Sequence, residues 1–315
     1  MEVIKKIEDL EKFKDYKNKI LKFENSVKFE IDIILGAGWS IEAGGSIEAG
    51  GSIEAGWSIE AGGSIEASES IKAGWSIEAG ESIEAGWSIE AGGFIKADES
   101  IKADESIKAG ESIKAGGSIK AGEFIKAGEF IEAGESIKAG GYIEAGGSIN
   151  AGRFIKAGWS INAGESIKAG ESIEAGGSIK AGWSIKADWS IEAGGSIKAD
   201  WSIEAGGSIE AGGSIKADGS IEAGEFIFSF SFSISAKSIS TQRLPFWRNF
   251  YADMPPMQKW RVQILSDLCW DELRKLPTKA EAREICLWDG WHWIIRGQLE
   301  CFFGLKRTFK PEIPI

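Results

Sequence analysis

The stretch GWSIEAGGSIEAGGSIEAGWSIEAGG, residues 38–63, sets the pattern for about two-thirds of the chain. Ile occupies every sixth position from Ile41 to Ile227, 32 times without an insertion or a substitution. The unit reads Ser-Ile-(Glu/Lys)-Ala-Gly, followed by Gly, Trp or Glu. So short a unit cannot bury its own apolar side chain and must stack on copies of itself. The period therefore predicts an all-β solenoid.

One unit read as a strand separates an interior from an exterior. Ile41 and Ala43 point to one side, while Ser40 and Glu42 point to the other. Gly44 permits the bend that starts the next strand. Three strands per coil would give a triangular β-helix with 18 residues per coil and a rod about 50 Å long. A two-sided coil is the alternative.

The tryptophans favour the three-sided coil. Trp39, Trp57 and Trp75 are spaced by 18 residues, as are Trp183 and Trp201, so their rings would stack on successive coils. Exposed aromatic ladders can anchor a partner, and they can also simply cover glycine-rich corners.

The array resembles the hexapeptide-repeat β-helix proteins, whose prisms carry an aliphatic residue every six positions. Many of those proteins are acyltransferases with a catalytic His in or beside the coils. Residues 36–236 contain no His, Cys or Pro, so the resemblance does not bring that activity with it. We expect no enzymatic activity and no cofactor.

Composition divides the chain into three parts. Residues 1–35 are lysine-rich, and the spacing of Ile4, Ile7, Leu10 and Phe13 predicts an amphipathic helix that caps the first coil, followed by an entry strand. Residues 36–236 form the solenoid. Residues 237–315 have ordinary globular composition with six Trp, and they predict a small, mostly α-helical domain that could make a homo-oligomer.

Two sets of side chains invite a metal interpretation. Cys269, Cys286, His292 and Cys301 lack the short Cys-x2-Cys spacing of zinc sites, which favours buried residues of a helical core. Acidic residues at the turn position could share a cation, although turn chemistry explains them more simply; the pairs are Asp200 with Asp218, and Asp98 with Glu99 and Asp104. We expect no metal site.

Charge is distributed unevenly along the chain. The net charge of −12 combines 15 basic and 31 acidic residues in the rod with a basic C-terminal part. Between Gly36 and Gly93 there are ten Glu and one Lys, or one net negative charge per ~1.7 Å of axis, similar to duplex DNA. A later block of lysines, from Lys96 to Lys126, has acidic residues beside it, whereas the first glutamates have almost no compensation.

We therefore expect an acidic interaction protein that blocks a basic, nucleic-acid-binding site on a partner protein. The rod itself should bind neither nucleic acid nor membranes. The residues expected to contact the partner are eight outward glutamates and three tryptophans: Glu42, Glu48, Glu54, Glu60, Glu66, Glu78, Glu84, Glu90, Trp39, Trp57 and Trp75.

Near-perfect SIEAG/SIKAG arrays resemble proteins of phages and mobile elements of bacteria. That resemblance implies an inhibitor of a bacterial defence nuclease, such as an anti-CRISPR protein. A structural or adhesive rod that assembles with itself is the alternative. The first residues alternate in charge, so we expect no secretory signal and a cytoplasmic location.

Overall fold

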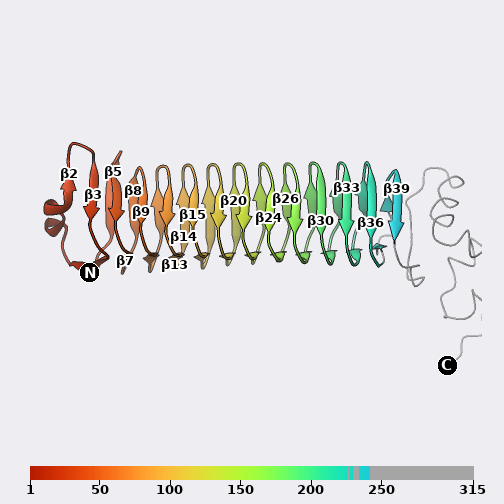
Figure 1. Ribbon diagram of the computed structural model, residues 1–315, viewed down its shortest axis with the longest axis horizontal. Coiled ribbons are helices and arrows are strands. Elements are labelled where there is room, and N and C mark those ends of the chain that lie inside the picture. The colour runs from red at the N-terminus through yellow and green to blue at the C-terminus, as the bar shows by residue number, and fades with distance from the viewer. Residues whose placement is uncertain (226, 230–233, 242–315) are drawn as a thin grey trace, which may run out of the picture.

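The computed structural model describes residues 1–225, 227–229 and 234–241 of the chain. Over these residues the backbone winds into a solenoid of about 12 coils, with the N-terminus at one end (Figure 1). Each coil contributes one strand to each of three sheets, which we name A, B and C and which are parallel except for the antiparallel pair β2–β3 at the start of sheet B. The chain passes through them in the order B, A, C before the next coil begins.

In the described part of the chain, the three sheets contain 13, 14 and 12 strands. The strands of sheet A are β1 (Glu2–Ile4), β4 (Val27–Phe29), β7 (Ile47–Ala49), β10 (Ile65–Ala67), β13 (Ile83–Ala85), β16 (Ile101–Ala103), β19 (Ile119–Ala121), β22 (Ile137–Ala139), β25 (Ile155–Ala157), β28 (Ile173–Ala175), β31 (Ile191–Ala193), β34 (Ile209–Ala211) and β37 (Ile227–Ser229). The strands of sheet B are β2 (Lys14–Asp15), β3 (Ile20–Phe23), β6 (Ser40–Ala43), β9 (Ile59–Ala61), β12 (Ile77–Ala79), β15 (Ile95–Ala97), β18 (Ile113–Ala115), β21 (Ile131–Ala133), β24 (Ile149–Ala151), β27 (Ile167–Ala169), β30 (Ser184–Ala187), β33 (Ser202–Ala205), β36 (Ser220–Ala223) and β39 (Ser238–Thr241). The strands of sheet C are β5 (Ile33–Ala37), β8 (Ile53–Gly56), β11 (Ile71–Ala73), β14 (Ser88–Ala91), β17 (Ser106–Ala109), β20 (Phe124–Ala127), β23 (Ile143–Ala145), β26 (Ile161–Ala163), β29 (Ile179–Ala181), β32 (Ile197–Ala199), β35 (Ile215–Ala217) and β38 (Ile234–Ser235).

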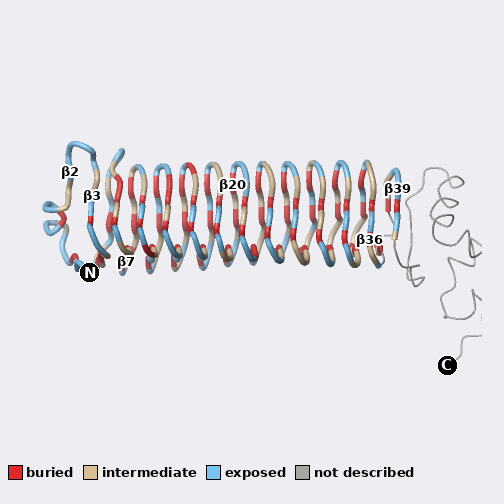
Figure 2. The backbone as a smooth tube through the Cα atoms, viewed as in Figure 1, coloured by how far each residue is buried: buried red, intermediate tan, exposed pale blue. Residues whose placement is uncertain are grey.

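The pairing register stacks equivalent residues of successive coils. Ile41 pairs with Ile59, and Ile59 with Ile77, so the step is 18 residues. This confirms the three-sided coil and excludes the two-sided one. Every Ile of the array from Ile41 to Ile227 is fully buried, and the residue two positions later, Ala in every unit except for Ser229, is nearly or fully buried. Figure 2 shows these buried positions recurring along the coils. Each buried Ile contributes about 1.5–3 kcal/mol relative to an exposed one.

In most units the glycine after Ala lies where successive coils approach closely, although Ser68 and five Asp residues occupy the same position in other units. A Cβ on Gly44 would lie 2.2 Å from the carbonyl oxygen of Glu24, and a Cβ on Gly110 would lie 1.8 Å from that of Gly92. The bend expected at Gly44 is present between β6 and β7, but it does not use a left-handed backbone, because Gly38 is the one glycine with positive φ in the described residues. Space between coils, rather than a left-handed backbone, selects glycine at most of these corners.

The N-terminal region differs from the predicted helical cap. Its one helix in the described chain is a 3-10 helix, η1 (Ile7–Phe13), and the hydrophobic spacing of three residues matches the three-residue turn of that helix. Leu10 of η1 is buried, and Phe13 packs on Phe23 with ring centroids 4.4 Å apart. Strands β1, β3, β4 and β5 already belong to the three sheets, so the coils begin before residue 36.

The first full coil contains two extra residues. Leu21, Val27 and Ile33 pair with isoleucines 20 residues later rather than 18. A register shift between Ile34 and Ala37 of β5 reduces the offset from 20 to 19, and the offset is 18 by Trp39, whose carbonyl oxygen accepts from Trp57. At the other end, the helical domain predicted for residues 237–315 lies outside the described residues, apart from the short segment that adds β39 to sheet B.

Two glycine substitutions test the close approach between coils. Gly110→Ala should destabilise the protein by about 1–3 kcal/mol because the methyl group would overlap a backbone carbonyl. Gly50→Ala is the matched control, since the nearest neighbouring atom is 3.8 Å from the position that its Cβ would take, and it should be neutral or slightly stabilising. Denaturant midpoints of the two variants measure the difference. Equal midpoints would contradict the steric account.

Candidate partner-binding surface

The coil geometry distributes the eight predicted glutamates over all three sheets. Sheet B carries Glu42, Glu60 and Glu78 in one stacked column. Sheet A carries a second column of three, formed by Glu48, Glu66 and Glu84. On sheet C, Glu54 and Glu90 are separated by Lys72. The structure thus brings the glutamates together as an acidic band around the rod, and no one sheet presents them all.

Both edges of this acidic band are neutralised by lysines one coil away. Lys22 and Lys28 of the first coils pair with Glu42 at 3.4 Å and with Glu48 at 2.9 Å. At the other edge Lys102 pairs with Glu84, and Lys108 pairs with Glu90 at 2.9 Å. The expectation of almost no compensation is therefore wrong for half of the eight glutamates.

These edge pairs hold the lysines charged. The hydrogen bond from Lys28 to Glu48 raises the pKa of the Lys28 ammonium, and Glu84 raises the pKa of Lys102 in the same way. The pairs are exposed to solvent, so each contributes little to stability. Their main effect is to restrict the uncompensated negative charge to the middle of the band.

Four glutamates in the middle of the band make no ion pair with any residue that the structure describes: Glu54, Glu60, Glu66 and Glu78. Glu60 and Glu78 are register partners on sheet B, about 4.8 Å apart along the rod at the backbone. Like charges in directly opposed positions repel each other. A cation supplied from outside would relieve that repulsion.

The three predicted tryptophans share one corner of the prism, between the strands of sheet C and those of sheet B. The backbone nitrogens of Trp57 and Trp75 donate hydrogen bonds to the carbonyl oxygens of Trp39 and Trp57, at 2.9 and 2.7 Å. The indoles of Trp57 and Trp75 stack with centroids 5.8 Å apart and planes inclined by 13°. Trp39 instead meets Tyr16 edge-on at 5.6 Å. The stacking expected from the 18-residue spacing is therefore confirmed for Trp57 and Trp75, whereas no ring contact is found for Trp39 with Trp57 or for Trp183 with Trp201 in the described residues.

We call the stacked pair and its flanking carboxylates the tryptophan corner: Trp57, Trp75, Glu54, Glu60 and Glu78. Trp57 is 52% exposed and Trp75 38% exposed, so the pair offers its surface to solvent. Glu54 precedes Trp57 on sheet C, while Glu60 and Glu78 follow the two indoles on sheet B. The glutamates of sheet A lie on the third face and do not adjoin this corner.

Beyond the acidic band, the charges of the second half separate by face. Sheet A carries Glu174, Glu192 and Glu210 in one column. Sheet C carries a column of three lysines, Lys180, Lys198 and Lys216. Along the sequence these residues look like a nearly balanced mixture. Reading the outward residues at intervals of 18 would have separated them.

One carboxyl of that acidic column titrates abnormally. Partial burial raises the pKa of Glu210, and the neighbouring Glu192 raises it further, while a hydrogen bond from Ser208 lowers it. A carboxyl whose pKa is higher in the folded chain than in the unfolded chain destabilises the fold once it ionises. Its unfavourable effect is absent below the unfolded pKa and grows as the pH rises through the folded one.

Glu210→Gln should therefore raise the Tm at pH 7, by about 1–2 °C because water screens this partly exposed group. At pH 3 the Tm of the variant and of the parent should agree, since the carboxyl is then neutral in both states. Glu174→Gln is the matched control on the same column. It removes a pair with Lys156 at 2.7 Å and should leave the Tm unchanged or lower it. A lower Tm for Glu210→Gln at pH 7 would contradict the repulsion.

The described residues contain no group of three or more His, Cys, Asp and Glu side chains arranged to hold a metal ion. Asp200 is paired with Lys198 at 3.6 Å. The cysteines and the histidine considered for zinc lie outside the described part of the chain. Within the same described part, no helix has the length and apolar character needed to cross a membrane.

Comparison of the chain with known proteins identified no relative. No protein-family model, no curated protein and no solved structure matches the chain.

Proposed function

We propose that the chain is a non-enzymatic interaction protein whose tryptophan corner binds a basic site on a partner protein. The observation that carries the proposal is the exposed stack of Trp57 and Trp75, with neighbouring carboxylates that form no ion pair within the described residues, although Lys72 and Lys96 are register partners of Glu54 and Glu78. Stacked indoles on the surface lower solubility unless a partner covers them. Carboxylates beside them select a cationic partner.

Arginine is the side chain that best fits this corner. Its planar guanidinium stacks on an indole face and binds carboxylates at the same time, which a lysine ammonium does less well. Glu54 lies on the strand of sheet C that precedes Trp57, and Glu60 lies on the strand of sheet B that follows it. An arginine-rich groove of a partner would therefore meet an aromatic surface bordered by negative charge.

Such grooves are typical of proteins that bind nucleic acid, because arginine and lysine contact phosphates there. The carboxylate columns of the rod repeat every ~4.8 Å and would occupy the positions of backbone phosphates. The resemblance of the array to phage and mobile-element proteins narrows the proposal to an inhibitor of a bacterial defence nuclease. Proteins captured by the rod from a bacterial lysate should then be released by added duplex DNA. If added duplex DNA does not release the captured proteins, the result would contradict this narrower proposal.

Neutralising the middle of the acidic band should weaken binding selectively. With a fluorescent nona-arginine peptide as the probe, Glu60→Gln combined with Glu78→Gln should raise the Kd about tenfold at 50 mM salt. The matched control is Glu192→Gln combined with Glu210→Gln, which removes two stacked carboxylates from another column and should change the Kd less than twofold. Raising the salt to 300 mM should increase the Kd of the parent chain more than that of the variant that lacks the Glu60 and Glu78 carboxylates. If both double variants lose affinity equally, the interaction depends on net charge alone and not on the tryptophan corner.

The indoles should discriminate between arginine and lysine. Trp57→Ala combined with Trp75→Ala should lower the preference for nona-arginine over nona-lysine by about threefold or more, because only the guanidinium gains from stacking. Trp183→Ala combined with Trp201→Ala is the control on the same corner, far from the acidic band. Fluorescence anisotropy measures both affinities. Filaments formed by the parent chain without any partner, seen by light scattering, would favour the self-assembling rod instead.

A further inference from the structure

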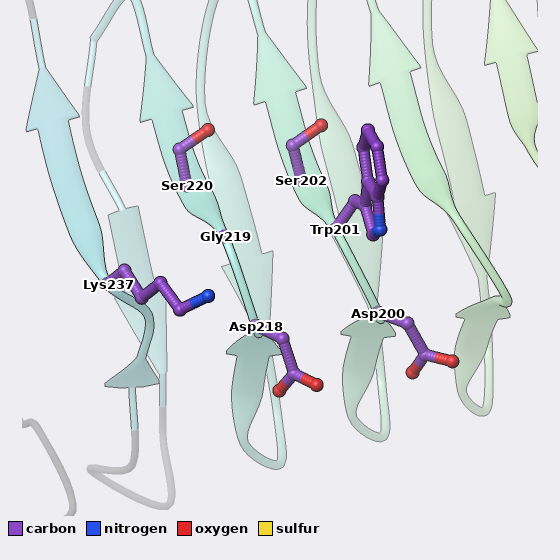
Figure 3. Close-up of a pocket in the computed structure, with 7 residues that line it drawn as sticks. All are labelled: Asp200, Trp201, Ser202, Asp218, Gly219, Ser220 and Lys237. Atoms are coloured by element: carbon purple, nitrogen blue, oxygen red, sulfur yellow. The ribbon is translucent and has the colours of Figure 1, made fainter.

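A second surface lies at the other end of the rod, on the same corner. An open groove of about 570 Å³ is present where the coils approach the end of the described residues (Figure 3). Its walls are the indole of Trp201 and the side chain of Lys237, with Gly219 between them. Asp218 and Ser220 border it on the sides of sheet C and sheet B.

The groove exists because one side chain is missing from a column. Trp201, Gly219 and Lys237 occupy the same corner position in three successive coils. Their backbones are continuous, since Gly219 donates to the carbonyl oxygen of Trp201 at 2.7 Å and Lys237 donates to that of Gly219 at 2.8 Å. At the level of Gly219 the column therefore has a backbone floor and no side chain above it.

The same corner at the acidic end shows how such a gap can be covered. There Trp75 precedes Gly93, and its ring lies 3.2 Å from the position that a Cβ of Gly93 would take. At Gly219 the three nearest atoms are all backbone atoms of Trp201. Trp201 is accordingly 74% exposed, against 38% for Trp75. Figure 3 shows the Trp201 indole nearly edge-on and upright, on the side of its strand away from Gly219, and Lys237 extending toward the level of Gly219.

The polar groups around the gap offer both kinds of hydrogen bond. Asp218 supplies acceptors, Lys237 supplies donors, and the hydroxyls of Ser202 and Ser220 supply both. Neither Asp218 nor Lys237 has an ion pair within the described residues, whereas Asp200 is paired with Lys198. The unpaired charges are thus one negative and one positive, so the groove has no net preference for an ion.

We propose that this groove binds a neutral sugar of the pyranose type. Such a ring has one apolar face, which stacks on an indole, and a rim of hydroxyls that need both donors and acceptors. A ring placed at the level of Gly219 would stack on Trp201 as Trp75 stacks on Trp57, with its hydroxyls within reach of Asp218, Ser220 and Lys237. The proposal is independent of the partner-binding function, because it uses a different set of residues.

Filling the gap tests the site in the full-length chain. Saturation-transfer NMR with methyl β-glucoside, methyl β-galactoside, N-acetylglucosamine and cellobiose should detect binding of at least one sugar with a Kd of about 1–10 mM. Gly219→Trp should abolish that signal by occupying the empty level. A Cβ at Gly219 would lie 2.5 Å from the carbonyl oxygen of Trp201, so this variant requires a local shift of the backbone, and the column does hold tryptophan directly after tryptophan at Trp57 and Trp75. Gly147→Trp, at the same corner between Glu129 and Glu165, is the matched control and should retain the signal.

Trp201→Ala is the second variant and should also abolish the signal, whereas Trp183→Ala, one coil earlier, should keep it. This pair decides the question even if Gly219→Trp fails to fold, which circular dichroism would show. No signal from any of the four sugars with the parent chain would overturn the proposal. A signal that survives in both Gly219→Trp and Trp201→Ala would overturn it as well, and so would binding of free indole in preference to every sugar.

Discussion

The structure depends on the distance between successive coils. Parallel strands hydrogen-bond at about 4.8 Å, so every side chain of one coil has an equivalent residue almost directly above it. Inside the rod this stacks isoleucine on isoleucine with no exposed apolar surface. At the corners it brings a carbonyl oxygen close to the Cβ position, which favours glycine in most units and still admits Asp or Ser in six of them. One spacing thus determines both the most hydrophobic and the smallest residues of the unit.

The same spacing places equal charges on top of one another on the outer surface. The chain compensates where glutamate and lysine blocks meet, as between Glu84 and Lys102, and leaves repulsion inside the blocks, as between Glu192 and Glu210. A sequence selected only for stability would alternate the two residues along each column. The long acidic run at the tryptophan corner therefore opposes stability, and the proposed binding of a cationic partner would give it a reason to persist.

The fold could be predicted from the sequence because a period of six with a buried isoleucine allows few arrangements, and the spacing of Trp57 and Trp75 selects the three-sided one. The ion pairs that neutralise Glu42 and Glu48 could not be predicted in this way. Their lysines, Lys22 and Lys28, precede the repeat, and two extra residues separate their coil from the next. The ring of Trp75 covers Gly93, whereas the ring of Trp201 leaves Gly219 open. The sequence period does not encode this difference in the placement of the two indoles. Regular features were therefore predictable, and departures from regularity required coordinates.

The triangular cross-section also constrains how such a gene can lengthen or shorten. Loss or gain of three units removes or adds one complete coil, which changes the reach of the rod and keeps every downstream column in line with the upstream one. Loss of a single unit would instead rotate everything beyond it by about a third of a turn. Trp183 and Trp201 would then move to a different edge from Trp57 and Trp75. Recombination between repeats is thus free to alter the angular relationship of the two ends while the hydrophobic interior stays unchanged.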